Sequence, residues 1–217
     1  MKKLHALVLG ATGATGQELV QLLLENPDFN KVSVFVRRKM SIKHNKLIVH
    51  ELDFSILHEY KDLVNGDILF SALGTTRKVA GSKKEQYLVD YTYQYEFAKM
   101  ASENQVNHYS LVSSVGANRK SWFFYPRIKG ALEESVKRLN FNKIHIFQPP
   151  SLIRQPDLIR GGEKISLQML NMLNKIGVLS SYRPLSVRDL AIKMIGEVKS
   201  RKSNIITVYK TKDLFVS

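Results

Sequence analysis

The chain has 217 residues, 44% of them hydrophobic and 24% charged, and this composition favours one globular domain with a full core over a disordered or fibrous chain. It has no cysteine, which excludes disulfides, thiolate metal sites and cysteine nucleophiles and favours a reducing compartment, so we expect a cytoplasmic protein. No signal-peptide cleavage pattern is visible and no window approaches ~20 apolar residues, so we also expect a soluble protein without a membrane partner.

The net charge of +14 is concentrated in the second half of the chain. Residues 1–108 contain 14 basic and 12 acidic side chains, whereas residues 109–217 contain 19 and 7. A basic half can attract nucleic acid, acidic lipids or a phosphorylated ligand. The cations are scattered instead of forming one long run, so we interpret them as a solvated surface and do not expect a nucleic-acid partner.

Short apolar runs alternate with helical stretches through the first 150 residues. The apolar runs predict strands at residues 4–9, 32–36, 46–52, 67–73, 109–113 and 143–147. The amphipathic stretches predict helices at residues 17–25, 82–104 and 125–139. Because strands separated by helical lengths need crossovers, we expect an α/β fold with helices on both faces of a doubly wound, mostly parallel sheet, a Rossmann fold.

The pattern loosens after Pro149 and Pro150. The remaining sequence predicts an irregular stretch at 152–162, helices at 163–176 and 186–199, and a last strand at 205–209. This part is too short for an independent domain. We therefore expect a single domain over residues 1–217, in which residues 150–185 form a small cap on the substrate side.

A glycine-rich turn, GATGATG at residues 10–16, follows the first predicted strand and opens the first predicted helix. In that context one glycine permits a tight turn, another lets backbone amides approach a pyrophosphate, and the last allows close helix packing. The spacing is G-x-x-G-x-x-G and differs from the G-x-G-x-x-G of common dehydrogenases. The alternatives are a turn without ligand and an RNA-binding KH loop at residues 13–16, against which the preceding parallel strand argues.

The end of the second strand indicates which dinucleotide to expect. An acidic residue there binds the ribose 2′-hydroxyl of NAD, whereas arginine accommodates the 2′-phosphate of NADP. Arg37 and Arg38 occupy this position and predict NADP(H), unless both are merely solvated charges. Asp53 after the third strand either accepts a hydrogen bond from the adenine amino group or caps a helix before Ser55.

Ser114, Tyr125 and Lys129 are the predicted catalytic residues. The strand at 109–113 delivers Ser113 and Ser114 to the carboxyl edge of the sheet, and Lys129 follows Tyr125 by one helical turn. An unperturbed phenol has a pKa of about 10, so it needs a nearby cation to exchange protons at neutral pH. Tyr125 would exchange the proton of a substrate carbonyl oxygen that Ser114, or Ser113, holds. The alternative for Tyr125 and Lys129 is an ordinary surface pair.

These features together resemble the short-chain dehydrogenase/reductase superfamily, and within it the atypical, NADP-binding, NmrA-like branch of the Tat-interacting tumour-suppressor oxidoreductases. The matching segments cover nearly the whole chain: GATGATG at 10–16, SSVGANRKSWFFYPRIKGALEE at 113–134, IFQPPSLIR at 146–154, RGGEKIS at 160–166 and YRPLSVRDLA at 182–191. The resemblance implies an NADP(H)-dependent oxidoreductase acting on a small carbonyl or alcohol. Many branches of the superfamily use the helix of the tyrosine and lysine for pairing, whereas atypical members can be monomers, so a monomer and a homodimer both stay open here.

The resemblance also implies a set of cofactor contacts. They are Gly10, Thr12, Gly13, Ala14, Thr15 and Gly16 in the phosphate loop, Arg37 and Arg38 at the 2′-phosphate, Asp53 and Phe54 near the adenine, Ala72, Leu73 and Gly74 beside the adenosine ribose, and Ser113, Tyr125, Lys129, Pro149 and Ser151 around the nicotinamide. One departure is Gln148, where relatives usually have an arginine.

Other functions compete with this prediction. An NADPH-binding sensor would change partner affinity without turnover, and a flavin reductase would need no tyrosine acid. No metal site is expected, because the six histidines form no H-E-x-x-H pattern, and a G-x-S-x-G nucleophile elbow is absent. The apolar residues 122–124 either line the substrate pocket or pack in the core.

Overall fold

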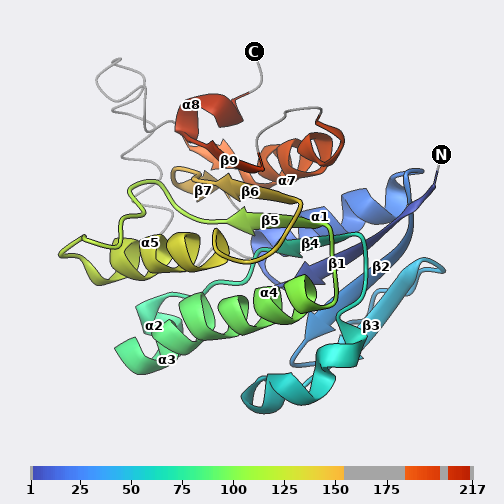
Figure 1. The fold of residues 1–217 in the computed structure, drawn as a ribbon, viewed down its shortest axis with the longest axis horizontal. Helices are drawn as coiled ribbons and strands as arrows, with labels where there is room; N and C mark the ends of the chain where they lie inside the picture. Colours follow the sequence, from blue (N-terminus) through green and yellow to red (C-terminus); the bar gives the residue numbers. More distant parts are fainter. Residues whose placement is uncertain (1, 154–183, 201–204, 216–217) are drawn as a thin grey trace.

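Seven parallel strands form one sheet in the part of the chain that the structure describes (Figure 1). The structure is a computed structural model and describes residues 2–153, 184–200 and 205–215. The strands of the sheet are β1 (Leu4–Leu9), β2 (Phe29–Val36), β3 (Leu47–Glu51), β4 (Ile68–Ser71), β5 (His108–Val112), β6 (Lys143–Phe147) and β9 (Ile206–Tyr209). Their spatial order is β3-β2-β1-β4-β5-β6-β9, which confirms the predicted doubly wound α/β fold.

The strand order creates a crevice at the middle of the sheet. β1 pairs with β2 on one side and with β4 on the other, so that Val8 lies between Val34 and Phe70. The segments that follow β1 and β4 therefore leave the sheet in different directions. Because all seven strands are parallel, their carboxyl ends share one edge, and the glycine turn meets the segments after β4 and β5 there.

Helices cover both faces of the sheet. Their bounds are α1 (Ala14–Glu25), η1 (Phe54–Leu63), α2 (Arg77–Ala80), α3 (Lys83–Tyr87), η2 (Leu88–Thr92), α4 (Tyr93–Glu103), α5 (Phe124–Val136), α7 (Val187–Gly196), η5 (Glu197–Lys199) and α8 (Thr211–Leu214). The helices α1, α7 and α8 pack on one face, whereas η1, α4 and α5 pack on the other (Figure 1). No described helix is long and apolar enough to span a bilayer.

The burial of β1 on both faces of the sheet explains why its sequence is an unbroken apolar run. Ala6 and Val8 are buried against the α1 and α7 layer, and Leu7 and Leu9 are buried against the α4 and α5 layer. Successive side chains of a strand point to opposite faces, so a strand covered on both faces needs apolar residues at every position.

The helix predicted at residues 82–104 is divided. Ser82 caps α3, which continues into η2, a π-helical turn, and then into α4. A π-helical turn inserts an extra residue into a helix and is frequent at functional sites. Asp90 lies in this turn and is fully buried.

The C-terminal part agrees with the prediction where it is described. Ser186 caps α7 by accepting a hydrogen bond from the Asp189 nitrogen, which confirms the helix expected from residue 186. Two short parallel strands, β7 (Leu152–Ile153) and β8 (Leu185–Ser186), pair at the ends of the predicted cap. The helix predicted at 163–176 lies outside the described residues.

Candidate functional site

The glycine turn joins β1 to α1 by close backbone contact. Gly10 has a φ of +88°, a conformation that favours glycine, and a Cβ on it would lie 2.5 Å from the Leu73 nitrogen. A Cβ on Gly16 would collide with the carbonyl oxygen of Gly10. Both positions therefore require glycine, and the backbone after β4 lies directly against the turn.

The N-terminus of α1 opens onto this turn. Gly13 is the N-cap residue, no side chain caps the helix, and the Gly13 nitrogen donates to the Gly10 oxygen at 3.0 Å. A helix start of this kind combines backbone donors with the positive end of the helix dipole. Together with the two glycine positions that exclude side chains, it forms a cradle that fits the diphosphate of a dinucleotide.

A cavity of about 150 Å³, here called the central cavity, joins this cradle to the predicted catalytic side chains. It is lined by Gly13, Ala14, Thr15, Ala72, Leu73, Gly74, Thr75, Val112, Ser113, Tyr125, Lys129, Leu152 and Val187. The fold thus brings half of the predicted phosphate loop, the predicted adenosine wall and two of the three predicted catalytic residues to one cavity.

Tyr125 and Lys129 lie one turn apart on α5 and both line the central cavity. Tyr125 is 38% exposed, whereas Lys129 is only 3% exposed. The Lys129 Nζ lies 3.9 Å from Asp90 Oδ1 and donates to the Val112 oxygen at 3.4 Å. Asp90 Oδ1 also accepts from the Thr75 nitrogen at 3.2 Å. Because Lys129 is buried beside a carboxylate, the interpretation of Tyr125 and Lys129 as a surface pair is wrong.

Asp90 is a charged residue of this site that sequence reasoning missed. It stands alone in the helical stretch YLVDY, far from Lys129 in the sequence, and matches no motif. Only the packing of η2 against α5 makes it a neighbour of Lys129. The one available signal was the position of this aspartate among apolar residues. If such an aspartate is buried, it usually has a charged partner.

Ser113 and Ser114 follow β5, but only Ser113 lines the central cavity. Ser113 is buried, and its hydroxyl donates to Oε1 of Glu133 on α5. The Gln148 amide donates to both oxygens of the same carboxylate, at 3.0 and 3.1 Å. The Ser114 hydroxyl instead donates to the Val115 oxygen at 3.2 Å. The geometry therefore favours Ser113 over Ser114 as the serine that faces a ligand.

A second cavity of about 360 Å³, here called the Arg37 cavity, lies at the ends of β2 and β3. It is lined by Arg37, Glu51, Leu52, Asp53 and Phe54. Asp53 caps η1, because its Oδ1 accepts from the Ser55 nitrogen at 2.8 Å and from the Ser55 hydroxyl at 2.7 Å. These bonds hold the pKa of the Asp53 carboxyl below its usual range. Arg38 is exposed and does not line this cavity.

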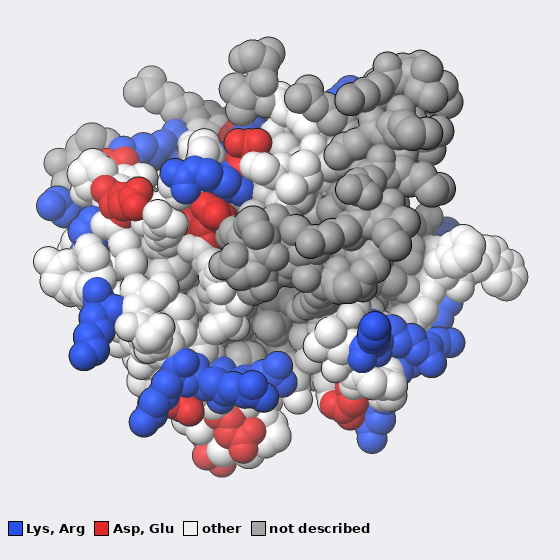
Figure 2. Space-filling model, turned by 180° about the vertical axis from the view of Figure 1, so that it is seen from behind, with Lys and Arg blue, Asp and Glu red and all other residues white. Residues whose placement is uncertain are grey.

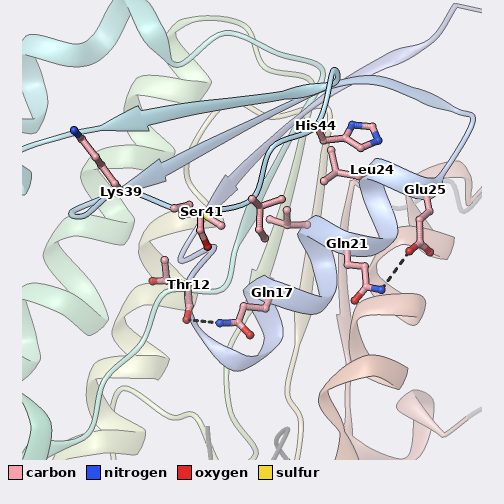
Figure 3. A pocket seen from close by; sticks show the side chains of 11 residues that line it. Thr12, Gln17, Gln21, Leu24, Glu25, Lys39, Ser41 and His44 are labelled. Atoms are coloured by element: carbon pink, nitrogen blue, oxygen red, sulfur yellow. Dashed lines mark hydrogen bonds between the residues drawn. The ribbon is translucent and has the colours of Figure 1, made fainter. Parts of the chain in front are cut away.

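A third cavity, of about 520 Å³, lies between α1 and residues 39–44 (Figure 3). Thr12 of the predicted phosphate loop lines it, and the Gln17 amide donates to the Thr12 oxygen at 3.4 Å. Its other lining residues belong to α1 and to the segment after β2. It shares no lining residue with the central cavity or the Arg37 cavity. It therefore borders the cradle without adding to the site around Tyr125.

Two predicted nicotinamide contacts make backbone interactions instead of lining these cavities. Pro149 is buried after β6, and its oxygen accepts from the Val115 nitrogen at 2.9 Å. Ser151 is exposed, and its oxygen accepts from the Leu185 nitrogen at 3.0 Å. Both residues fix the chain where it leaves β6.

The chain matches the family model for NAD(P)H-binding proteins over residues 10–141. The protein "FMP52-1, mitochondrial" of Scheffersomyces stipitis is 34% identical over 181 residues, which cover 81% of this chain and 76% of the relative. The protein HTATIP2 of Rattus norvegicus is 33% identical over 178 residues, covering 80% of this chain and 73% of the relative. The protein "FMP52, mitochondrial" of Meyerozyma guilliermondii is 31% identical over 219 residues, which cover 96% of this chain and 93% of the relative.

These relatives contradict the expected cytoplasmic location. Several of them carry names that state a mitochondrial location. The expectation rested on the missing cysteines, and a cysteine-free composition indicates a reducing environment without selecting one compartment.

Solved structures of low sequence identity share the fold. The Bordetella bronchiseptica enzyme WbmH, solved with NAD+, superposes with a TM-score of 0.71 at 16% identity, covering 97% of this chain and 75% of its own. The UDP-glucuronic acid 4-epimerase of Bacillus cereus, solved with NAD, superposes with a TM-score of 0.68 at 14% identity. The match covers 96% of this chain and 78% of the epimerase chain. Since the family model spans more than half of the chain and the relatives cover most of it, the chain belongs to the NAD(P)H-binding family, in the atypical short-chain dehydrogenase/reductase branch that includes HTATIP2 and FMP52.

Proposed function

We propose that the protein is an NADP(H)-dependent oxidoreductase that acts on a small carbonyl compound or alcohol, with Tyr125 as general acid and base. The observation that carries this proposal is that Tyr125 and Lys129 line the same cavity as the first turn of α1. Open α/β sheets bind ligands at the carboxyl ends of their strands, where this cavity lies. A dinucleotide held by the glycine turn and a proton donor would therefore share one small space.

The proposed reaction is a hydride transfer coupled to a proton transfer. A bound nicotinamide supplies the hydride to a carbonyl carbon, or accepts it from an alcohol in the reverse direction. The Tyr125 hydroxyl donates a proton to the carbonyl oxygen, and its phenolate takes the proton back in the reverse direction. Since Tyr125 is partly exposed, the phenol can exchange this proton with water between turnovers.

Lys129 and Asp90 provide the electrostatic support for Tyr125 in this proposal. A buried ammonium group stabilises a nearby phenolate, and a buried carboxylate stabilises the ammonium group. Asp90 also binds the Thr75 nitrogen and thereby fixes the segment after β4 that lines the cavity. We therefore assign Asp90 as a positioning residue and Lys129 as the cation that acts on Tyr125.

We assign the substrate-holding role to Ser113 and not to Ser114, because only Ser113 lines the central cavity. Its hydroxyl proton is donated to Glu133, so its oxygen is left to accept a hydrogen bond from a substrate donor other than the reacting hydroxyl, whose proton goes to Tyr125. Leu152 and Val187 flank the predicted cap and also line the cavity, which supports a substrate-side cap at residues 150–185.

The preference for NADP(H) over NAD(H) rests on the Arg37 cavity. The exposed Arg37 guanidinium can pair with a 2′-phosphate, and Phe54 offers an apolar ring for an adenine. Glu51 lines the same cavity and would repel a phosphate group. The proposal requires that the attraction of Arg37 outweighs this repulsion.

The test follows the transferred hydrogen. Purified protein is incubated with NADPH carrying deuterium at C4 and with a panel of aldehydes and ketones, and mass spectrometry detects deuterium in the alcohol products. We expect Tyr125→Phe to slow the transfer by about 100-fold or more while the Kd for NADPH changes by less than about threefold. Tyr87→Phe is the matched control, because Tyr87 is 40% exposed and lies outside the cavity.

Three results would contradict the proposal. Equal transfer rates for Tyr125→Phe and the unmodified protein would remove Tyr125 from the chemistry. Tight NADPH binding without deuterium transfer to any compound would favour a sensor. Deuterium loss to a flavin alone, unchanged in Tyr125→Phe, would indicate a flavin reductase.

A further inference from the structure

The segment between β5 and α5 carries two large aromatic side chains into solvent. Trp122 is 95% exposed and Phe123 is 77% exposed, so the alternative that they pack in the core is wrong. Neither residue lines the central cavity. In Figure 1 this segment protrudes beyond the neighbouring helices at one end of the molecule. We call residues 115–123 the aromatic tip.

The aromatic tip is held firmly to the domain. A Cβ on Gly130 would collide with the backbone of Asn118 and Arg119, so the tip lies directly on α5. The Asn118 nitrogen donates to the Pro126 oxygen at 3.0 Å, and the Arg127 side chain donates to the Trp122 oxygen at 3.2 Å. The exposure of the two aromatic side chains therefore belongs to an ordered loop and not to a fraying end.

The charge around the aromatic tip is positive. Residues 104–132 contain no aspartate or glutamate, whereas Arg119, Lys120 and Arg127 are exposed next to the two aromatic residues. The Lys83 Nζ lies 5.7 Å from the centre of the Phe124 ring and adds a further cation from α3. The nearest opposing charge that pairs with the tip is Glu134, which binds Arg119 at 3.1 Å. Figure 2, which shows the opposite face, has lysine and arginine side chains beside uncharged atoms at this end of the molecule, with acidic atoms close below them.

We propose that the aromatic tip docks on an anionic phospholipid surface, with Trp122 and Phe123 inserted at the level of the headgroups. Tryptophan prefers the interface between hydrocarbon and water, because its ring is apolar and its indole N–H needs a polar partner. Cations that flank such rings are attracted by acidic headgroups. A protein partner with an apolar pocket would satisfy the two rings, but it would leave unexplained the absence of acidic residues over residues 104–132.

This proposal departs from the expectation of a protein without a membrane partner. That expectation rested on the absence of a long apolar segment, and docking by a protruding loop needs none. The proposal is independent of the oxidoreductase activity. It would place the Tyr125 entrance next to the lipid surface, because Tyr125 follows Phe123 by two positions at the start of α5.

The test uses the fluorescence of Trp122, the single tryptophan of the chain. The full-length protein is titrated with vesicles of phosphatidylcholine containing about one third phosphatidylglycerol and, separately, with vesicles of pure phosphatidylcholine. We expect the emission of Trp122 to move to shorter wavelength with the acidic vesicles only. High salt should reverse the change, since it screens the attraction between cations and headgroups.

Matched variants separate the aromatic and the cationic parts of the surface. We expect Phe123→Ala and Lys120→Glu each to weaken vesicle binding by about tenfold. Ile192→Ala removes an exposed apolar side chain from α7, and Lys3→Glu reverses an exposed charge just before β1, at the amino end of that strand. Both controls should bind as the unmodified protein does.

Three outcomes would overturn the proposal. The first is an emission spectrum that neither vesicle changes. The second is an equal change with both vesicles, which would remove the role of the cations. The third is a change that appears without lipid as protein concentration rises, which would make the aromatic tip a contact between two copies of the chain.

Discussion

The two ends of the candidate cofactor site differ in the burial of their cations. Lys129 at the central cavity is 3% exposed and lies beside the buried carboxylate of Asp90. Arg37 at the other end is exposed and lines an open cavity. A buried cation must be compensated inside the protein, whereas an exposed cation can be compensated by water or by a ligand. Substitutions at the first end should therefore affect folding and chemistry together, and substitutions at the second end should affect ligand selection alone.

A substitution in the glycine cradle between the two ends should have the largest effect on cofactor binding. We expect Gly16→Ala to abolish NADPH binding and to lower the yield of folded protein, because the added Cβ would collide with the Gly10 oxygen. Gly196→Ala is the matched control, since a Cβ there meets no atom within 4 Å. Circular dichroism and calorimetric titration of both variants make the comparison. Normal NADPH binding by Gly16→Ala would mean that the turn is less tightly packed than described.

Breaking the buried pair should destabilise the domain strongly. Asp90→Asn leaves the Lys129 ammonium group without its carboxylate, which typically costs about 3–5 kcal/mol of unfolding free energy. Glu103→Gln breaks the exposed pair of Lys61 and Glu103 and should cost far less, because water and salt screen an exposed pair. Urea unfolding at pH 7 measures both. Equal losses for the two variants would show that burial of Lys129 does not matter.

At the exposed end we expect a change of selectivity without a change of stability. Arg37→Ala should weaken NADPH binding by about tenfold and leave NADH binding within about twofold, because NADH lacks the 2′-phosphate with which the guanidinium group would pair. Glu51→Gln should strengthen NADPH binding slightly by removing a repulsive carboxylate from the same cavity. Competitive titrations of both cofactors provide the measurement. Parallel weakening of NADPH and NADH would argue against a 2′-phosphate contact.

The effect that is smallest at neutral pH is that of a histidine in the interior of the sheet. Burial, reinforced by His145 and Lys143, lowers the pKa of His108 to about 3. An unfolded chain takes up a proton near pH 6.5, which the folded chain resists, so this histidine reduces stability as pH falls from about 6.5 towards 3. The slope is at most about 1.4 kcal/mol per pH unit. His108→Gln should flatten the acid side of a plot of Tm against pH, and an unchanged slope would contradict the assignment.

The sequence predicted the sheet, the cradle and the positions of Tyr125 and Lys129, because these depend on local patterns. Periodicity revealed the strands, and a glycine turn between a strand and a helix has one common use. Asp90, Glu133 and the choice between Ser113 and Ser114 depend on contacts between segments that are distant in sequence. No local pattern reports such contacts, and the π-helical turn that carries Asp90 has no sequence signal of its own.

Composition was a weaker guide than pattern. The missing cysteines led to a cytoplasmic location that the mitochondrial relatives contradict. Apolar residues at 122 and 123 suggested a pocket or a core, yet both side chains are exposed. Hydrophobicity alone does not say whether a side chain is covered by the same chain, by a ligand or by another surface.

The most direct test of the central claim is a calorimetric titration of the unmodified protein with NADPH and with NADH under identical conditions. The cradle at the glycine turn together with Arg37 predicts that NADPH binds at one site per chain and at least about tenfold more tightly than NADH. Binding of neither cofactor would contradict the cofactor site itself. Equal binding of both would retain the site but contradict the preference for NADP(H).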